Sequence, residues 1–428
     1  MELKKVILEQ NQQWQKKTSN EQFVRRDLLS KFKLKSDFIE VVVGVRRSGK
    51  STILRLVAEE IVAKKMAEPR EILFANFDNP SFLPYYEHPE KLDELIEQAE
   101  AINGQKIKYL FLDEVQNISF WEKWVKAKYD QKIFKKIFIT GSNANLLFGQ
   151  YISRLSGRYF AHTNYPYSFK EYLTARQIPF FKKEIDNFSL KHKHAAAFNE
   201  FVRSGGFPEI VQTGDGDIIE SYYQTIILKD VADLRGVRDG LSLKQLAYYL
   251  VTNATQFVSY NNIAKQLGIH ENTVKEYLSF FQDAYLFYEL KKFDYSLKKQ
   301  MANKRKLYIV DNAFINKIGF SFSDDSGKFF ENLVFTELLK AGLEVYYYGG
   351  VNECDFVIKK NNHIKAAIQV CYDLNEKNRK REIAGAVEAM MVCELKESYI
   401  LTNAQEEVVN SEGCKIIVMP IWRWLLEN

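Results

Sequence analysis

The chain has 428 residues with 46% hydrophobic and 27% charged side chains and a formal net charge of +5, and at about 150 residues per domain its length predicts roughly three domains. The apolar share excludes a largely disordered protein, no apolar run approaches the roughly 18 residues that cross a bilayer, and the N-terminus turns polar too early for a secretory signal. We therefore expect a cytoplasmic protein without a membrane partner, and four widely spaced cysteines argue against a zinc site.

Residues 37–165 alternate apolar, strand-like runs with longer helical stretches. In chain order the runs read FIEVVVGV, REILFANF, IKYLFLDEV, KKIFITGS and RYFAHTNY. Because these runs are apolar almost without interruption, they are typical of parallel strands that are covered on both faces. We predict an α/β fold with a parallel sheet here, preceded by an N-terminal helical segment over residues 1–36.

The first run leads into Gly-Val-Arg-Arg-Ser-Gly-Lys-Ser at residues 44–51, which fits the phosphate-loop pattern G-x-x-x-x-G-K-[ST] and precedes a helical stretch. Backbone N–H groups and the helix N-terminus attract phosphates, Lys50 reaches the outer phosphates, and Ser51 can hold Mg²⁺. The alternative, a chance glycine-rich turn, is disfavoured by motif and context together. The predicted nucleotide contacts are Gly44, Arg46, Arg47, Ser48, Gly49, Lys50, Ser51 and Thr52.

The third run ends in two adjacent carboxylates, Asp113 and Glu114. We expect Asp113 to hold Mg²⁺ together with Ser51, and Glu114 to polarise the water that attacks the γ-phosphate. With Lys50, this pair predicts ATP hydrolysis and not binding alone; the alternative is a solvated helix start. ATP is preferred to GTP because no N-K-x-D segment follows the loop, and residues 303–306 read NKRK.

The fourth run ends in small polar side chains, of which Thr140, Ser142 or Asn143 can face the γ-phosphate; the alternative is a turn that caps the next helix. Two arginines follow, Arg154 and Arg158. We expect one of them, Arg158 in the first place, to reach the nucleotide of a neighbouring subunit as an arginine finger; the alternative is a structural ion pair. A finger that acts in trans requires a homo-oligomer.

The segments GVRRSGKST, YLFLDEVQN, IFITGSN and SRLSGRY, with YPYSFKEYL and GGFPEIV further on, resemble a group of bacterial and archaeal AAA+ ATPases related to the origin-recognition clade. The resemblance covers nearly the whole chain. It implies an AAA+ P-loop core over residues 37–165, a helical lid over 166–240, a winged helix with a basic wing over 241–315, and a restriction-endonuclease-like α/β domain of unassigned function over 325–428.

Residues 257–290 contain two short helical patterns separated by Gly268, which is typical of a helix-turn-helix. Residues 291–306 then hold seven Lys or Arg against one Asp, as expected for a basic wing that contacts phosphates. The alternative is a packing module of the lid with a solvated basic hairpin. The predicted DNA contacts are Lys275, Lys298, Lys299, Lys304 and Arg305.

Residues 329–372 read helix, strand, strand, strand and resemble the core of PD-(D/E)xK nucleases. Glu331 and Asp355 match the acids of that family, but Gln369 stands where the next acid belongs and Cys371 where the lysine belongs. Neither replacement supplies the charge that holds Mg²⁺ or stabilises a phosphorane. We expect a degenerate nuclease site, unless a migrated acid such as Glu353 fills the gap.

The sequence therefore predicts a Mg²⁺-dependent, ATP-hydrolysing AAA+ protein that couples its nucleotide cycle to DNA engagement or remodelling. The alternative is a nucleotide-gated regulatory or scaffold protein that docks a protein partner, with slow hydrolysis as a timer. A third hypothesis, an ATPase coupled to a metal-dependent nuclease, needs the degenerate site to be active.

Overall fold

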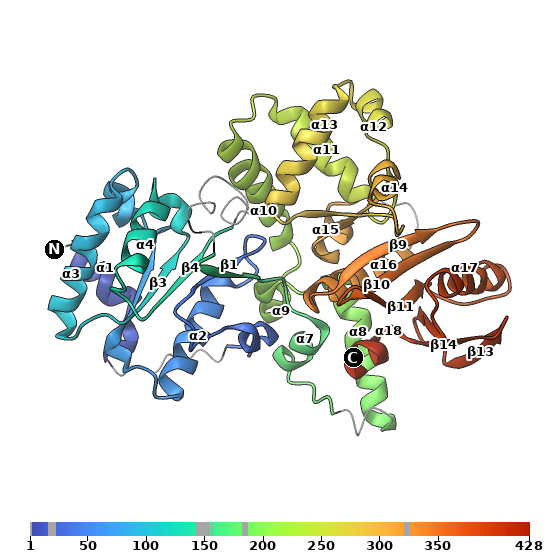
Figure 1. Cartoon of the computed structure of the whole chain (residues 1–428), viewed down its shortest axis with the longest axis horizontal. Coiled ribbons are helices and arrows are strands. Elements are labelled where there is room, and N and C mark those ends of the chain that lie inside the picture. Colours follow the sequence, from blue (N-terminus) through green and yellow to red (C-terminus); the bar gives the residue numbers. More distant parts are fainter. Residues whose placement is uncertain (1, 16–22, 143–154, 156, 182–186, 321–325) are drawn as a thin grey trace. The chain divides into compact units, whose positions relative to one another are not determined.

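The computed structural model describes residues 2–15, 23–142, 155, 157–181, 187–320 and 326–428. The chain forms two compact units (Figure 1). The N-terminal unit consists of residues 1–165 and 283–285, and the C-terminal unit of residues 166–282 and 286–428. No helix in the described part of the chain is long and apolar enough to cross a bilayer.

The N-terminal unit is built on a five-stranded sheet in the order β2-β3-β4-β1-β5, and every neighbouring pair is parallel. Each of the five apolar runs forms one of these strands, which confirms the predicted α/β class. The strands are β1 Ile39–Val43, β2 Ile72–Asn76, β3 Tyr109–Asp113, β4 Lys136–Thr140 and β5 Tyr159–Thr163. The helices are α1 Glu2–Gln10, α2 Lys50–Ala63, α3 Leu92–Asn103 and α4 Trp121–Asp130. Short 3-10 turns are η1 Gln12–Gln15, η2 Asp27–Lys31, η3 Pro69–Glu71, η4 Pro80–Tyr85, η5 Pro89–Lys91 and η6 Val115–Asn117.

Aromatic side chains stack across the middle of this sheet. The ring centroids of Phe74 and Phe111 lie 4.6 Å apart, and those of Phe111 and Phe138 lie 4.4 Å apart. These residues are direct partners on β2, β3 and β4, so the stack follows the register of the ladder. All five residues of β1, β3 and β4 are buried, as expected for strands that are covered on both faces.

The exposed edge of the sheet is closed by side chains of the N-terminal segment. Asn11 both donates to the carbonyl of Phe74 and accepts from its N–H, at 3.0 and 2.8 Å. Gln10 makes the same pair of bonds to Asn76, at 3.2 and 2.9 Å. The two amide side chains therefore replace a neighbouring strand along β2 and satisfy an edge that would otherwise pair with another chain.

The C-terminal unit begins with helices and a small antiparallel sheet in the order β6-β8-β7. Its helices are α7 Phe169–Ala175, α8 Phe188–Ser204, α9 Pro208–Thr213, α10 Ile218–Thr225, the π-helix η8 Ile226–Asp233, α11 Gly240–Thr252, α12 Tyr260–Leu267, α13 Glu271–Asp283, α14 Leu297–Ala302 and α15 Asn312–Lys317. The three strands are β6 Phe257–Val258, β7 Phe287–Leu290 and β8 Arg305–Ile309.

The rest of this unit is a six-stranded mixed sheet in the order β13-β14-β12-β11-β10-β9. The helix and three strands expected over residues 329–372 are present as α16, β9, β10 and β11. The helices are α16 Ser326–Lys340, α17 Arg379–Val392 and α18 Ile421–Glu427. The strands are β9 Glu344–Gly349, β10 Glu353–Lys360, β11 His363–Val370, β12 Glu397–Thr402, β13 Glu407–Ser411 and β14 Cys414–Pro420.

Candidate nucleotide site

The loop between β1 and α2 has the shape that its glycines permit. Gly44 has φ +141°, and a Cβ at this position would lie 2.1 Å from the carbonyl oxygen of Asn164. Gly49 adopts φ +91° as the N-cap of α2. Any larger residue at position 44 would clash with backbone, and both backbone conformations favour glycine. The two glycines of the motif therefore set the path of the loop.

The ammonium of Lys50 lies inside this loop. Lys50 is buried, and its Nζ donates to the carbonyl oxygens of Gly44 at 3.1 Å and Val45 at 3.2 Å. Nζ also lies 3.9 Å from Oε1 of Glu114, which follows β3. Because β3 and β1 flank β4 in a parallel sheet, their carboxyl ends meet at the same edge. The sheet thus brings the lysine of the loop and the second acid of Asp113-Glu114 together.

Thr140, the last residue of β4, joins the two acids. Its Oγ1 accepts from the backbone N–H of Glu114 at 3.0 Å and donates to a carboxylate oxygen of Asp113. All three residues are buried. The sequence offered Thr140, Ser142 or Asn143 as the residue that faces the γ-phosphate; the hydroxyl of Thr140 contacts the carboxylate of Asp113 and the backbone N–H of Glu114.

Burial dominates the electrostatics of Glu114. Loss of solvent raises the pKa of its carboxyl, the positive charge of Lys50 opposes this rise, and the charge of Asp113 adds to it, so the net direction is upward. Glu114 also adopts a left-handed backbone with φ +52°, which is uncommon for a residue with a side chain. A carboxylate with a raised pKa is a stronger base than an exposed glutamate, which suits it to polarise water.

Two residues that the sequence analysis missed hold the loop from outside. The carbonyl oxygen of Ser48 accepts from Nδ2 of Asn164 at 2.8 Å and from Nη1 of Arg26 at 3.2 Å. Arg26 also donates through Nη2 to the carbonyl of Tyr165 at 2.7 Å. Asn164 directly follows β5, so a polar residue at the carboxyl end of a parallel strand was the available signal.

Replacing Asn164 by alanine is expected to loosen the loop. The change removes a buried hydrogen bond to Ser48, so the free energy of unfolding should fall by about 1–3 kcal/mol, and KM for ATP should rise more than kcat falls. Asn103→Ala is the matched control, because buried Asn103 donates to the carbonyl of Arg70 at 2.8 Å away from the loop. Equal KM values for the two variants, measured by steady-state turnover and denaturation, would contradict a positioning role for Asn164.

The other predicted nucleotide contacts lie on or beside the loop. Ser51 is exposed in the first turn of α2, Thr52 and Arg46 are half-buried, and Arg47 is exposed with φ +68°. Ser142 is buried just after β4, so it also lies at the carboxyl edge of the sheet. Asn143 and Arg154 lie outside the described residues, and their predicted roles stay predictions.

Arg158 lies at the opposite end of the sheet from the phosphate loop of its own chain. It precedes β5, and its carbonyl accepts from the N–H of Ile39, the first residue of β1, at 2.8 Å. Its Nε lies 3.1 Å from Oδ1 of Asp130. Arg158 therefore makes the structural ion pair that was the alternative interpretation. A role as a finger toward another subunit stays a prediction.

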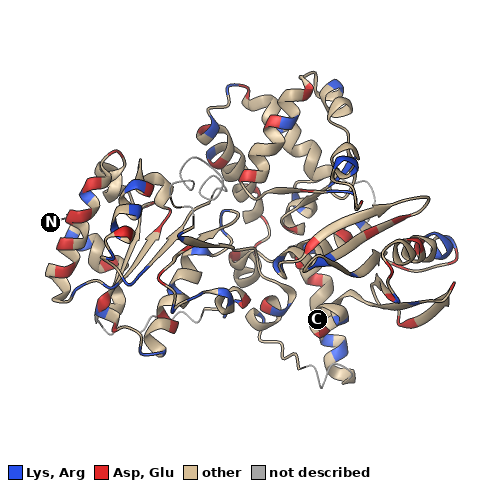
Figure 2. Cartoon of the chain, viewed as in Figure 1, with Lys and Arg blue, Asp and Glu red and all other residues tan. Residues whose placement is uncertain are grey.

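The expected helix-turn-helix segment forms α12 and α13, with Gly268 between them at φ +67°. Lys275 on α13 pairs with Glu271 at 2.6 Å, and Arg305 on β8 pairs with Glu289 at 3.1 Å. Three of the predicted phosphate contacts remain exposed on or next to α14, where Figure 2 shows a cluster of basic residues: Lys298, Lys299 and Lys304.

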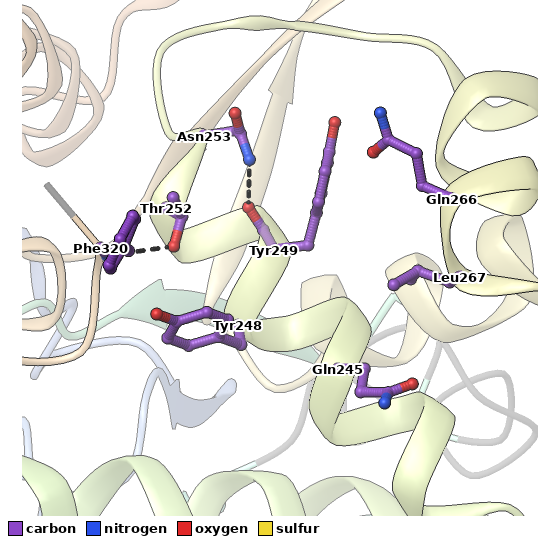
Figure 3. Close-up of a pocket in the computed structure, with 8 residues that line it drawn as sticks. All are labelled: Gln245, Tyr248, Tyr249, Thr252, Asn253, Gln266, Leu267 and Phe320. Carbon is purple, nitrogen blue, oxygen red and sulfur yellow. Dashed lines mark hydrogen bonds between the residues drawn. The ribbon is translucent and has the colours of Figure 1, made fainter.

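A cavity of 590 Å³ opens beside α11, lined by aromatic rings and amides that include Tyr248, Tyr249 and Gln266 (Figure 3).

The start of the basic segment is not a free hairpin. The N–H of Phe293 donates to the carbonyl of Tyr347 at 2.7 Å, and the N–H of Tyr347 donates to the carbonyl of Lys291 at 3.0 Å. Residues 291–293 therefore extend the six-stranded sheet beyond β9. Phe293 is buried in the hydrophobic core of that sheet. The alternative interpretation as a solvated hairpin does not hold for these residues, because their backbone pairs with a sheet edge and the ring of Phe293 is buried.

The predicted nuclease residues occupy neighbouring positions on α16, β10 and β11. Gln369 accepts from the N–H of Asp355 at 3.0 Å and donates to Glu382 at 2.5 Å. Cys371 is buried, and burial raises the pKa of its thiol to about 12. Glu331 and Asp355 both contact the ammonium of Lys306 on β8. Among the described residues, no group of three or more His, Cys, Asp or Glu has the geometry to hold a metal ion.

Family models match two parts of the chain. Residues 36–173 match a family model described as an AAA domain, and residues 195–324 match one described as a domain of unknown function, DUF8612. The chain is 31% identical over 432 residues to the uncharacterized protein MJ1544 of Methanocaldococcus jannaschii, covering 94% of this chain and 91% of that protein. It is 30% identical over 404 residues to an uncharacterized protein of Haemophilus influenzae, covering 90% and 94%.

Among solved structures, the chain is similar to ORC1 of Aeropyrum pernix in complex with DNA, with 13% identity, a TM-score of 0.29 and coverage of 65% of this chain and 85% of that one. It is also similar to AMPPCP-bound DnaA of Aquifex aeolicus, with 17% identity, a TM-score of 0.25 and coverage of 60% and 85%.

Proposed function

Because the chain belongs to the family of MJ1544 of Methanocaldococcus jannaschii and carries an AAA domain, we propose that it binds ATP with Mg²⁺ and hydrolyses it to ADP and phosphate. The observation that carries this proposal is the buried pair of Lys50 and Glu114, whose charged atoms lie 3.9 Å apart beside the phosphate loop. Hydrolysis needs a cation that binds phosphate and a base that activates water. Lys50 and Glu114 supply these two groups side by side.

The donor atoms at the site suit a hard divalent cation. Ser51 offers a hydroxyl in the first turn of α2, and Asp113 offers the carboxylate oxygen that does not bond to Thr140. Mg²⁺ is commonly held by one or two protein oxygens together with substrate phosphates. Bound there, Mg²⁺ would neutralise charge on the phosphates during hydrolysis.

Different residues of this chain would then bind the phosphates and activate the water. Backbone N–H groups of residues 44–51 and the N-terminus of α2 bind and orient the phosphates. Lys50 turns its ammonium from the loop carbonyls toward the outer phosphates, and Glu114 accepts a hydrogen bond from the attacking water. Thr140 holds the carboxylate of Asp113 and the backbone N–H of Glu114 in place. The direct test is phosphate release from Mg·ATP by the purified chain, and a chain that folds and binds ATP but releases no phosphate would contradict hydrolysis.

We further propose that the ATPase engages DNA through the exposed lysines at α14. Reversing Lys298, Lys299 and Lys304 to glutamate should weaken DNA binding and reduce the slope of log affinity against log salt by about 0.9 for each phosphate that the protein no longer neutralises. The matched control reverses the exposed residues Lys377, Lys380 and Lys396, which changes the net charge equally. Fluorescence anisotropy over a salt series measures both. Equal slopes for the two triple variants would exclude a specific role of α14.

A second candidate function is favoured by the apolar residues beside those lysines. Tyr295, Leu297 and Met301 are 77%, 67% and 64% exposed, which is unusual for side chains of this size. A surface of this kind suits a protein partner, with the nucleotide cycle acting as a timer. DNA binding that is absent, or that does not change with salt, would favour this regulatory function over DNA engagement.

A further inference from the structure

Three carboxylates of the C-terminal unit surround a single ammonium. Nζ of Lys306 on β8 lies 3.0 Å from Oε1 of Glu331, 2.5 Å from Oε1 of Glu353 and 3.0 Å from Oδ1 of Asp355. Glu331 comes from α16, and the other two acids come from β10. The cluster therefore joins the small antiparallel sheet, a helix and the six-stranded sheet through one cation.

Three members of the cluster have little contact with solvent, whereas the side chain of Glu353 is 41% exposed, and the buried polar atoms make hydrogen bonds. The side chains of Lys306 and Asp355 are 6% and 8% exposed, and that of Glu331 is 16% exposed. Tyr308 donates to Oε1 of Glu331 at 2.7 Å, and the N–H of Val370 donates to Oδ2 of Asp355 at 2.9 Å. An ammonium with so little solvent is stable only when opposite charges and hydrogen bonds replace its water.

The protonation of the cluster agrees with this arrangement. Burial by itself lowers the pKa of Lys306, but the negative charges of its neighbours more than offset burial, so the net direction is upward. Burial, together with the charge of Asp355, raises the pKa of Glu331 to about 7. Lys306 therefore keeps its positive charge, whereas the negative charge of Asp355 makes Glu331 harder to ionise.

We infer that Lys306 is a built-in cation that occupies and closes the acidic site of the C-terminal unit. Three carboxylate oxygens converge within 3.0 Å of one point, and carboxylate oxygens are the ligands that hard divalent cations prefer; with the ammonium at that point, the described acids are not arranged to hold a metal ion. The ammonium stands at that point, so such an ion cannot enter without displacing it. The degenerate site is thus a metal-free, structural link between β8 and the acids on α16 and β10, and cleavage of nucleic acid with Mg²⁺ is not expected.

The inference predicts that removing the ammonium creates a need for a metal. Lys306→Met replaces the side chain by an unbranched apolar one that is a single atom shorter, and it leaves three acids facing one another. In nucleotide-free protein, its Tm should be lower than that of the unchanged chain by on the order of 10 °C. Millimolar Ca²⁺ should restore several degrees, because an ion that binds only the folded state stabilises it.

Two further variants make the result specific. Lys304→Met, which removes an exposed lysine two residues earlier, should have an unchanged Tm with and without Ca²⁺. The double variant Lys306→Met with Asp355→Asn should regain stability without Ca²⁺ and should respond to Ca²⁺ weakly, because one repelling charge and one ligand are gone.

The outcomes separate cleanly. A response to Ca²⁺ that is confined to Lys306→Met supports the built-in cation. An unchanged Tm for Lys306→Met, or a response to Ca²⁺ as large in the unchanged chain, overturns it. If Lys306→Met is recovered only as aggregate, soluble recovery of the double variant supports the inference and continued aggregation of the double variant contradicts it.

Discussion

Replacing Lys50 by alanine is expected to reduce ATP turnover by roughly 10²–10³-fold, the usual effect of removing one preorganised group that stabilises the charge of a transition state. Nζ of Lys50 is held by two loop carbonyls and lies near Glu114, so the ammonium already lies inside the loop and only has to turn from these carbonyls toward the outer phosphates. Alanine suits the first turn of α2, so the fold should survive. The loss should appear both in nucleotide affinity and in kcat.

Phosphate release and the binding of a fluorescent ATP analogue measure these two effects. Lys64→Ala is the matched control, because Lys64 lies at the far end of the same helix and pairs with Glu60 at the surface. That control should keep full turnover. If Lys50→Ala, with an unchanged far-ultraviolet circular dichroism spectrum, hydrolysed ATP at the rate of the unchanged chain, the loop would not be the nucleotide site.

Glu114→Gln is expected to separate binding from hydrolysis. The amide keeps the shape of the carboxyl but accepts no proton, so turnover should fall by roughly 10²–10⁴-fold while ATP stays bound. The pH dependence gives a second signature. Because burial raises the pKa of Glu114, its carboxylate is lost at a higher pH than that of an exposed glutamate. Turnover of the unchanged chain should therefore decline as the pH falls through that raised pKa.

The residual turnover of Glu114→Gln should lack this decline. Rates from pH 5 to pH 9 at saturating Mg·ATP test it, with Glu97→Gln on the exposed face of α3 as the control. A variant that binds ATP normally and turns over at the unchanged rate would show that another group activates the water. A variant that fails to bind ATP would instead assign Glu114 to binding.

The convergence of the candidate nucleotide-site residues was predictable because its signals are local in the sequence. Continuous apolar runs predict buried parallel strands, and the order of those strands brings residues 50, 113, 114 and 140 to one edge. Arg26 and Asn164 escaped prediction because both act on the backbone carbonyl of Ser48, and any residue has a carbonyl. Their function depends on a contact across 116 positions in the case of Asn164, which no spacing rule reveals.

The role of Lys306 was hidden by its neighbours in the sequence. It lies in a run of basic residues, and composition alone predicts that such a run faces solvent. A strand alternates its side chains, however, so Lys306 and Tyr308 share one face of β8 while Arg305 and Leu307 share the other. Both Lys306 and Tyr308 bond to Glu331. The alternation of side chains along the strand was the available signal that Lys306 faces inward. The many basic neighbours of Lys306 in the sequence masked this signal.

The pairing of residues 291–293 with β9 also limits where the chain can be divided. A fragment that starts at residue 325 would lack Phe293, which fills the core of the six-stranded sheet, and the backbone that pairs with Tyr347. The free edge of β9 would then be open to self-association. Expression of the last α/β domain as an independent piece therefore needs a start no later than residue 286, which retains the strand pair β7 and β8. A gene fusion or exchange that separated residues 291–293 from the last α/β domain would open the same edge of β9.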